Sequence, residues 1–125
     1  MNIAIACVVI SAVLPLACAT IAKWGFEAYD NRQPRQWLAG QTGFRARANA
    51  AQANSWEAFP IFAAGVLAAL MLGAPQQRVD AIASAFVVAR VVYIALYVSD
   101  RATLRSLVWT VGFALSLSLY FAAYW

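Results

Sequence analysis

An uncharged run at residues 3 to 22 is the feature that most constrains the fold of this chain. A helix needs about 20 mostly apolar residues to cross the roughly 30 Å hydrocarbon core of a bilayer. The run has that length, and Lys23 and Trp24 follow it, as expected of anchors at a membrane surface. A cleavable signal peptide is the alternative because residues 17 to 19 are small, but no Lys or Arg precedes the run. We therefore expect a first membrane span here.

Three further apolar segments follow the first. They cover residues 48–72, 81–98 and 104–125. Hydrophobic residues make up 64% of the 125 residues and charged residues only 11%, which leaves too few polar groups for the surface of a small soluble domain. Four spans also leave no room for a separate soluble module. The sequence predicts a single domain over residues 1–125, an all-α integral membrane four-helix bundle with antiparallel, up-and-down topology.

Basic residues are concentrated in the first and third connections between these spans, whereas the second connection holds Arg78 alone. Because Lys and Arg accumulate on cytoplasmic loops, both termini are expected to face away from the cytoplasm. The net charge of +4 then reflects topology and an anionic ligand, so no nucleic-acid partner is expected. The chain has no His, and the spacing of Cys7 and Cys18 matches no ligand pattern, so no metal site is expected.

Glu57 and Arg90 carry opposite charges inside two of the predicted spans. A charge at such a depth costs at least about 2.5 to 3.5 kcal/mol, so each needs a partner or a hydrated cavity. Counting from the cytoplasmic ends of the spans places Glu57 at a depth of roughly 15 Å and Arg90 at roughly 12 Å. We expect the two charges to meet at one level and to line a hydrated, anion-tolerant recess. An ion pair with a purely structural role is the alternative.

Other polar residues share a helix face with each of these charges. The face on the second span carries Arg47, Ala50, Asn54 and Glu57, and the face on the third carries Arg90, Tyr93, Tyr97 and Arg101. Both faces are expected to point inward. Arg101 and Arg105 also flank the start of the fourth span, where the free N–H groups of a helix N-terminus favour an anion. Ordinary retention of positive charge on the cytoplasmic side is the alternative for these two.

The sequence resembles a known membrane family at three places. Residues 47–60 read RANAAQANSWEAFP, with Asn-x-x-Glu followed by Phe-Pro, residues 89–97 read ARVVYIALY, and residues 104–106 read LRS. These segments are similar to those of the MAPEG family, the membrane-associated proteins in eicosanoid and glutathione metabolism, and indicate a short member of the bacterial type. The resemblance covers the whole four-helix layout.

The resemblance implies a homotrimer in the bacterial inner membrane that binds glutathione, its cosubstrate, between subunits near the cytoplasmic side. The residues implied in binding are Asn54, Glu57, Arg90, Tyr93, Tyr97, Arg101 and Ser106. Arg105 is the implied catalytic residue beside the thiol, with Tyr97 second. A guanidinium favours the nucleophilic thiolate, which attacks a lipophilic electrophile from the surrounding membrane lipids or reduces a lipid hydroperoxide. Eukaryotic members carry Arg beside the Asn-x-x-Glu motif, where this chain has Ala50 and Ala53.

Two other functions are compatible with four short spans. A small multidrug transporter needs a membrane-embedded carboxylate in its first span, but that span has no acid here, and Arg90 repels cations. A non-catalytic membrane scaffold needs Glu57 and Arg90 only to fix the register of its helices. Glutathione binding by the purified protein separates these functions, with Glu57→Gln and Arg105→Ala as diagnostic variants.

Overall fold

The computed structural model describes residues 2–125, and every regular element in that range is helical. The four long helices are α1 (Ile3–Ala22), α3 (Gly43–Met71), α4 (Gln76–Val98) and α5 (Ala102–Leu119). Each is long and apolar enough to cross a membrane, which confirms the predicted all-α fold class. A short 3-10 helix, η1 (Trp24–Phe26), and a six-residue helix, α2 (Pro34–Ala39), lie between α1 and α3.

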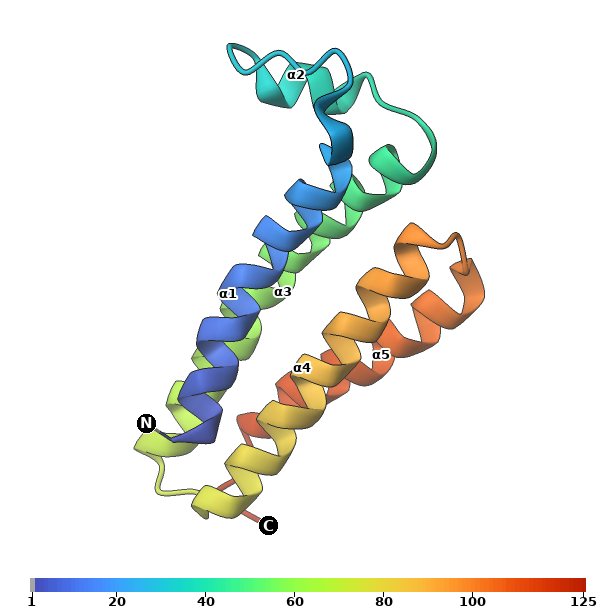
Figure 1. The fold of residues 1–125 in the computed structure, drawn as a ribbon. Helices are drawn as coiled ribbons and strands as arrows, with labels where there is room; N and C mark the ends of the chain where they lie inside the picture. The colour runs from blue at the N-terminus through green and yellow to red at the C-terminus, as the bar shows by residue number, and fades with distance from the viewer. Residues whose placement is uncertain (1) are drawn as a thin grey trace.

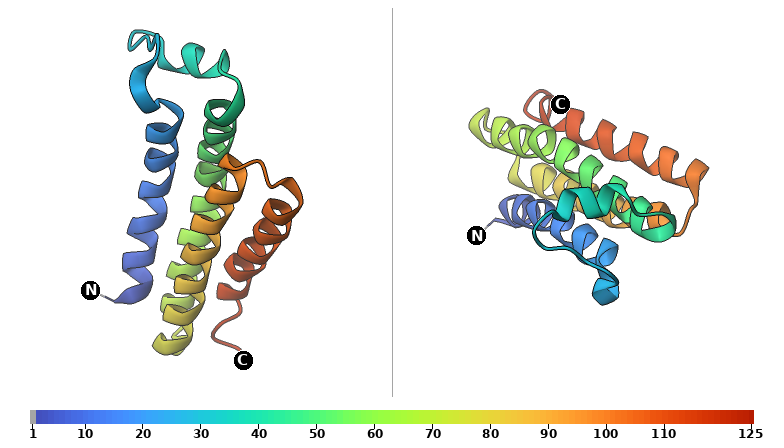
Figure 2. Two further views of the ribbon diagram at one scale, coloured as in Figure 1. Left: turned by 45° about the vertical axis from the view of Figure 1, so that its right-hand side comes forward. Right: turned by 90° about the horizontal axis from the view of Figure 1, so that it is seen from above.

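Helices α3 and α4 lie in the middle of the bundle, and the other two long helices flank them. Figure 2 shows α1 and α5 on opposite sides of this pair. α1 packs against α3 and α4, and α5 packs against the same two helices. Both chain ends and the turn between α3 and α4 lie together at one end of the molecule, whereas η1 and α2 lie at the other (Figure 1). The two ends of the bundle therefore carry different connections.

We call the half of the bundle around Phe62 and Phe86, next to the chain termini, the closed end. The largest apolar cluster lies here and joins all four long helices. The Phe62 and Phe86 rings stack with centroids 3.9 Å apart, and they are 0% and 1% exposed. A Cβ on Gly65 of α3 would lie 3.0 Å from Tyr120 Cε2 and 3.1 Å from the Ser116 carbonyl oxygen, so any other residue would push α5 away by a few tenths of an ångström. The closed end is tightly packed.

Hydrogen bonds from charged side chains hold the chain ends at the closed end. Asp80 of α4 accepts from the backbone N–H of Ala4 and from the side-chain amide of Gln76, both at 2.8 Å. Arg78 donates to the Ala122 carbonyl at 2.6 Å. These bonds satisfy backbone groups near the start of α1 and beyond the end of α5, where helices lack internal partners.

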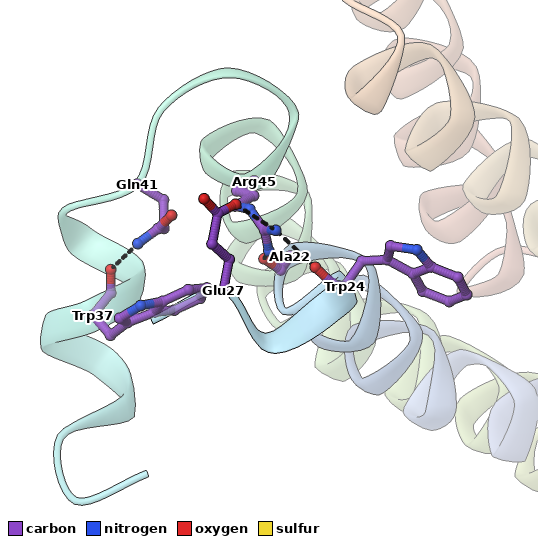
Figure 3. A network of polar contacts seen from close by, with 6 residues as sticks. All are labelled: Ala22, Trp24, Glu27, Trp37, Gln41 and Arg45. Carbon is purple, nitrogen blue, oxygen red and sulfur yellow. Dashed lines mark hydrogen bonds and ion pairs between the residues drawn. The ribbon is translucent and has the colours of Figure 1, made fainter. Parts of the chain in front are cut away.

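The connection between α1 and α3 is more regular than the loop predicted over residues 23–47, because it contains η1, α2 and the start of α3. Arg45 organises it. Its guanidinium donates to the carbonyls of Ala22 at 2.9 Å and Trp24 at 2.7 Å, and it lies 3.7 Å from the Glu27 carboxylate (Figure 3). Because carbonyls at a helix C-terminus have no helical donor, Arg45 caps α1.

Candidate functional site

A cleft of about 220 Å³ opens among α3, α4 and α5. Its polar lining includes Asn54 and Glu57 from α3 and Arg90 from α4. Most of the remaining lining is apolar, and Trp109 and Phe113 of α5 stack there with ring centroids 5.3 Å apart. A mainly apolar pocket with a few convergent polar groups is the usual form of a small-molecule site. We take this cleft and the polar residues next to it as the candidate site.

Arg90 lines the cleft and is only 4% exposed. Its guanidinium donates to the Ser55 hydroxyl of α3 at 3.1 Å. The guanidinium carbon also lies 4.2 Å from the centroid of the Tyr93 ring, which is one turn further along α4. A hydroxyl and an aromatic face together stabilise this buried cation without removing its charge.

Glu57 and Arg90 do not form the structural ion pair that was the alternative interpretation of these two charges. Within residues 2–125 no carboxylate oxygen lies within 4.0 Å of the Arg90 guanidinium. Ser55 and Glu57 are two positions apart on α3, so they project to nearly opposite sides, and Arg90 packs on the side of Ser55. Glu57 is exposed and does not face the core of the bundle, but it lines the same cleft as Arg90.

Asn54 is partly buried, whereas Ser55 is buried and Glu57 is exposed on the same helix. Its amide nitrogen donates a long hydrogen bond, 3.5 Å, to Glu57 Oε2. Its carbonyl oxygen is buried and has no hydrogen-bond partner within residues 2–125. An unpaired buried acceptor is unfavourable, and a ligand donor in the cleft would relieve it.

Two arginines and two tyrosines form a column along α4 toward the start of α5. Beyond the stacked pair of Arg90 and Tyr93, Tyr93 meets Tyr97 edge to face with centroids 5.6 Å apart. Arg105 of α5 closes the column, with its guanidinium carbon 4.2 Å from the centroid of the Tyr97 ring. Steps of three and four residues place the α4 members on one face, as predicted. We call this column and the adjoining α4–α5 turn the open end.

Two predicted site residues lie outside both the column and the cleft. Arg101 is exposed in the turn before α5. Ser106 is also exposed, and its hydroxyl donates to the Ala102 carbonyl of its own helix at 3.1 Å. Neither residue lines the cleft among α3, α4 and α5, and of the column residues only Arg90 lines it. Their contribution to glutathione binding stays a prediction.

The structure adds residues that the sequence analysis does not single out. Ser55 holds Arg90, and Trp109, Gly112 and Ser116 of α5 line the cleft. Trp109, Gly112 and Ser116 are three and four residues apart, a spacing that could have predicted that they share one face of α5. In an apolar helix, however, the same spacing also fits a face that contacts lipid, so it does not indicate a pocket by itself.

The fold and the site define a class of protein: a helical integral membrane protein with a mainly apolar cleft that holds a few polar groups among three of its helices. The MAPEG family model matches residues 3–125, and the chain belongs to that family. This confirms the resemblance seen in the three sequence segments. Comparisons with curated proteins and with solved structures gave no match.

Proposed function

We propose that this protein is a membrane-embedded, glutathione-dependent transferase or peroxidase that acts on lipophilic electrophiles. Membership of the MAPEG family supports a reaction of this kind. The observation that carries the proposal is the environment of Arg105. Its guanidinium lies over the Tyr97 ring, and within residues 2–125 it has no carboxylate partner. Such a cation favours the ionised form of a nearby thiol.

The remaining polar groups of the site suit the peptide part of glutathione. Glu57 offers a carboxylate to the ammonium group, and Asn54 offers its free carbonyl oxygen to an N–H donor. Arg90 offers a guanidinium to a glutathione carboxylate, a pairing that forms strong charge-assisted hydrogen bonds. Arg101 and Ser106 complete the proposed binding set near the α4–α5 turn.

The proposed chemistry begins with the glutathione thiolate. In transfer, its sulfur attacks an electrophilic carbon, a carbon–sulfur bond forms, and the leaving group departs with its electron pair. In peroxide reduction, the sulfur attacks the terminal oxygen of the hydroperoxide, so that a sulfur–oxygen bond forms as the O–O bond breaks. The alkoxide that leaves takes up a proton from water and is released as an alcohol. A second glutathione then displaces water from the oxidised sulfur and yields glutathione disulfide. The Trp109 and Phe113 walls suit an apolar substrate that arrives from the bilayer.

We further propose a homotrimer in the bacterial inner membrane, with antiparallel spans and both termini facing away from the cytoplasm. The concentration of basic residues in the first and third connections supports this orientation. Val9, Val13 and Leu16 of α1 are each about half exposed and offer an apolar face to lipid or to a neighbouring subunit. Mass measurement of the complex released from nanodiscs tests the trimer, and a monomer would contradict it.

Turnover by the purified protein in lipid nanodiscs tests the proposed activity. Glutathione with chlorodinitrobenzene reports on transfer, and glutathione with cumene hydroperoxide reports on peroxide reduction. We expect turnover in at least one assay and a loss of about hundredfold in Arg105→Ala, because one transition-state donor has that effect in other enzymes. Glu57→Gln should weaken glutathione binding about tenfold, since a charged hydrogen bond becomes neutral.

Arg32→Ala is the matched control, because Arg32 is exposed in the connection between α1 and α3 and its loss changes the net charge equally. We expect it to keep turnover and glutathione affinity within about twofold of wild type. A wild-type protein that binds no glutathione would contradict the proposal and leave the scaffold function. Equal losses in Arg32→Ala and Arg105→Ala would contradict the assignment of Arg105.

A further inference from the structure

The guanidinium groups of Arg45 and Arg105 both lie over an aromatic ring, but within residues 2–125 only that of Arg45 has hydrogen-bond partners. Arg45 lies 5.7 Å from the Trp37 ring centroid, donates to two backbone carbonyls and lies beside the Glu27 carboxylate (Figure 3). Two of its N–H groups are thus hydrogen-bonded, and its charge is offset. Arg105 lies 4.2 Å from the Tyr97 ring centroid and has no side-chain hydrogen bond or ion pair within residues 2–125. Tyr97 is thus the contact that orients Arg105.

The geometry of a guanidinium explains why this difference matters. Its five N–H donors lie in one plane, so a ring that stacks on its face leaves all of them available. A carboxylate would also fix its orientation, but it would occupy donors and neutralise the charge. The face of Tyr97 therefore aims Arg105 while leaving its charge and its donors free for an anionic ligand.

The Tyr97 ring is itself held by the column. Its neighbour Tyr93 is 4% exposed and meets it edge to face at an interplanar angle of 85°. The Tyr93 ring in turn carries the Arg90 guanidinium. The Tyr97 hydroxyl makes no hydrogen bond within residues 2–125, so the ring is the engaged part of this side chain.

We infer that Tyr97 is a positioning residue, whose ring face aims the Arg105 guanidinium at the glutathione sulfur, and that its hydroxyl transfers no proton in the reaction. The inference rests on the proposed function, in which Arg105 stabilises the thiolate. It differs from the sequence-based view of Tyr97 as a second catalytic residue.

Substitutions of Tyr97 distinguish the contribution of its ring from that of its hydroxyl. The measurements are kcat and KM with glutathione and chlorodinitrobenzene, and the ultraviolet absorbance of the bound thiolate. Tyr97→Leu should lower kcat and the thiolate signal about tenfold, the size of one partly desolvated cation–π contact, with a smaller change in KM. Tyr97→Phe should restore most of this loss. Tyr124→Leu, which removes an exposed tyrosine, is the control for the change of side chain.

A fluorination series keeps the shape of the ring and guards against misfolding of Tyr97→Leu. Phenylalanine with increasing numbers of fluorine atoms at position 97 withdraws electron density from the ring face while preserving its volume. If the face holds Arg105, kcat should fall stepwise along the series. An unchanged kcat along the series would overturn the inference.

Chemical modification of arginine tests the positioning without any turnover. Phenylglyoxal labelling in the absence of glutathione, mapped by mass spectrometry, should be slower at Arg105 in wild type and Tyr97→Phe than in Tyr97→Leu, because the ring covers one face of the guanidinium. The exposed Arg101 is the internal reference. Equal labelling of Arg105 in all three proteins would overturn the inference, and so would a Tyr97→Phe variant as inactive as Tyr97→Leu. Wild-type protein without turnover would contradict the proposed function, while the labelling pattern would still decide the positioning.

Discussion

The closed and open ends of the bundle use their charged residues in different ways. At the closed end, Asp80 and Arg78 bond to backbone groups of other segments. At the open end, Arg47 also donates to a backbone carbonyl, that of Val98, at 3.0 Å. Arg90, in contrast, bonds only to the Ser55 hydroxyl, and Arg101 and Arg105 have no side-chain hydrogen bond or ion pair within residues 2–125. A charge bonded within the chain stabilises the fold. A charge that is oriented but not neutralised is available to a ligand.

The closed end also has the larger apolar core of the two ends. The closed end contains the stacked Phe62 and Phe86 rings within a cluster that joins all four long helices. The apolar cluster nearer the open end is smaller and includes Cys18 and Tyr93. We therefore expect substitutions at the closed end to change the free energy of unfolding, and substitutions at the open end to change ligand binding and turnover.

Phe62→Ala should give the largest loss of stability. Removal of a ring that is 0% exposed leaves a cavity against Phe86, and we expect the free energy of unfolding to fall by about 3 kcal/mol. Unfolding in mixed micelles measures this loss. Phe121→Ala is the control, since Phe121 is 62% exposed and its loss should change stability by less than about 0.5 kcal/mol. Similar losses in both variants would break the comparison.

Gly65→Ala should lower stability by about 1 to 2 kcal/mol, because its new Cβ would meet Leu119 Cβ and the Ser116 carbonyl oxygen at 3.1 Å. Gly112→Ala provides the matched control in the cleft region, where the nearest atom to a new Cβ is Ala89 Cβ at 3.9 Å. Its thermal unfolding temperature should stay level or rise, since alanine favours helix. A lower unfolding temperature in Gly112→Ala than in Gly65→Ala would contradict the account of the α3–α5 contact.

Asp80→Asn should lower stability by about 1 kcal/mol, because a charge-assisted hydrogen bond to the Ala4 N–H becomes a neutral one. Asp100→Asn is the control. Asp100 is exposed in the α4–α5 turn at φ 61°, a conformation that asparagine also adopts readily. Thermal unfolding of both variants gives the comparison, and a larger loss in Asp100→Asn would show that the open end also depends on its charges for stability.

Arg101→Ala should give the smallest effect. Its side chain is exposed, so the free energy of unfolding should change by less than about 0.5 kcal/mol. Removal of a positive charge near the proposed anion site should still weaken glutathione binding by about twofold, and less at high ionic strength. Calorimetric titration at two salt concentrations measures this. A loss as large as that of Arg105→Ala would place Arg101 inside the site.

The sequence predicted the helices and the residues of the column better than it predicted their partners. Apolar runs identify spans because the bilayer sets their length, and the cost of a buried charge singles out Glu57 and Arg90. Periodicity leaves the rotation of one helix against another open, so it does not reveal that Arg90 turns to Ser55. The cap of α1 by Arg45 joins residues more than twenty positions apart, and no local pattern encodes it.

The central claim is that Arg105 at the open end is available to the glutathione thiolate, and proton release on binding tests it most directly. Titration of glutathione into the protein in nanodiscs, repeated near neutral pH in buffers of different ionisation enthalpy, gives the number of protons released. We predict about one proton per glutathione bound in wild type and markedly fewer in Arg105→Ala, because the thiol ionises beside the guanidinium. Binding without proton release in wild type, or equal release in both proteins, would contradict the account.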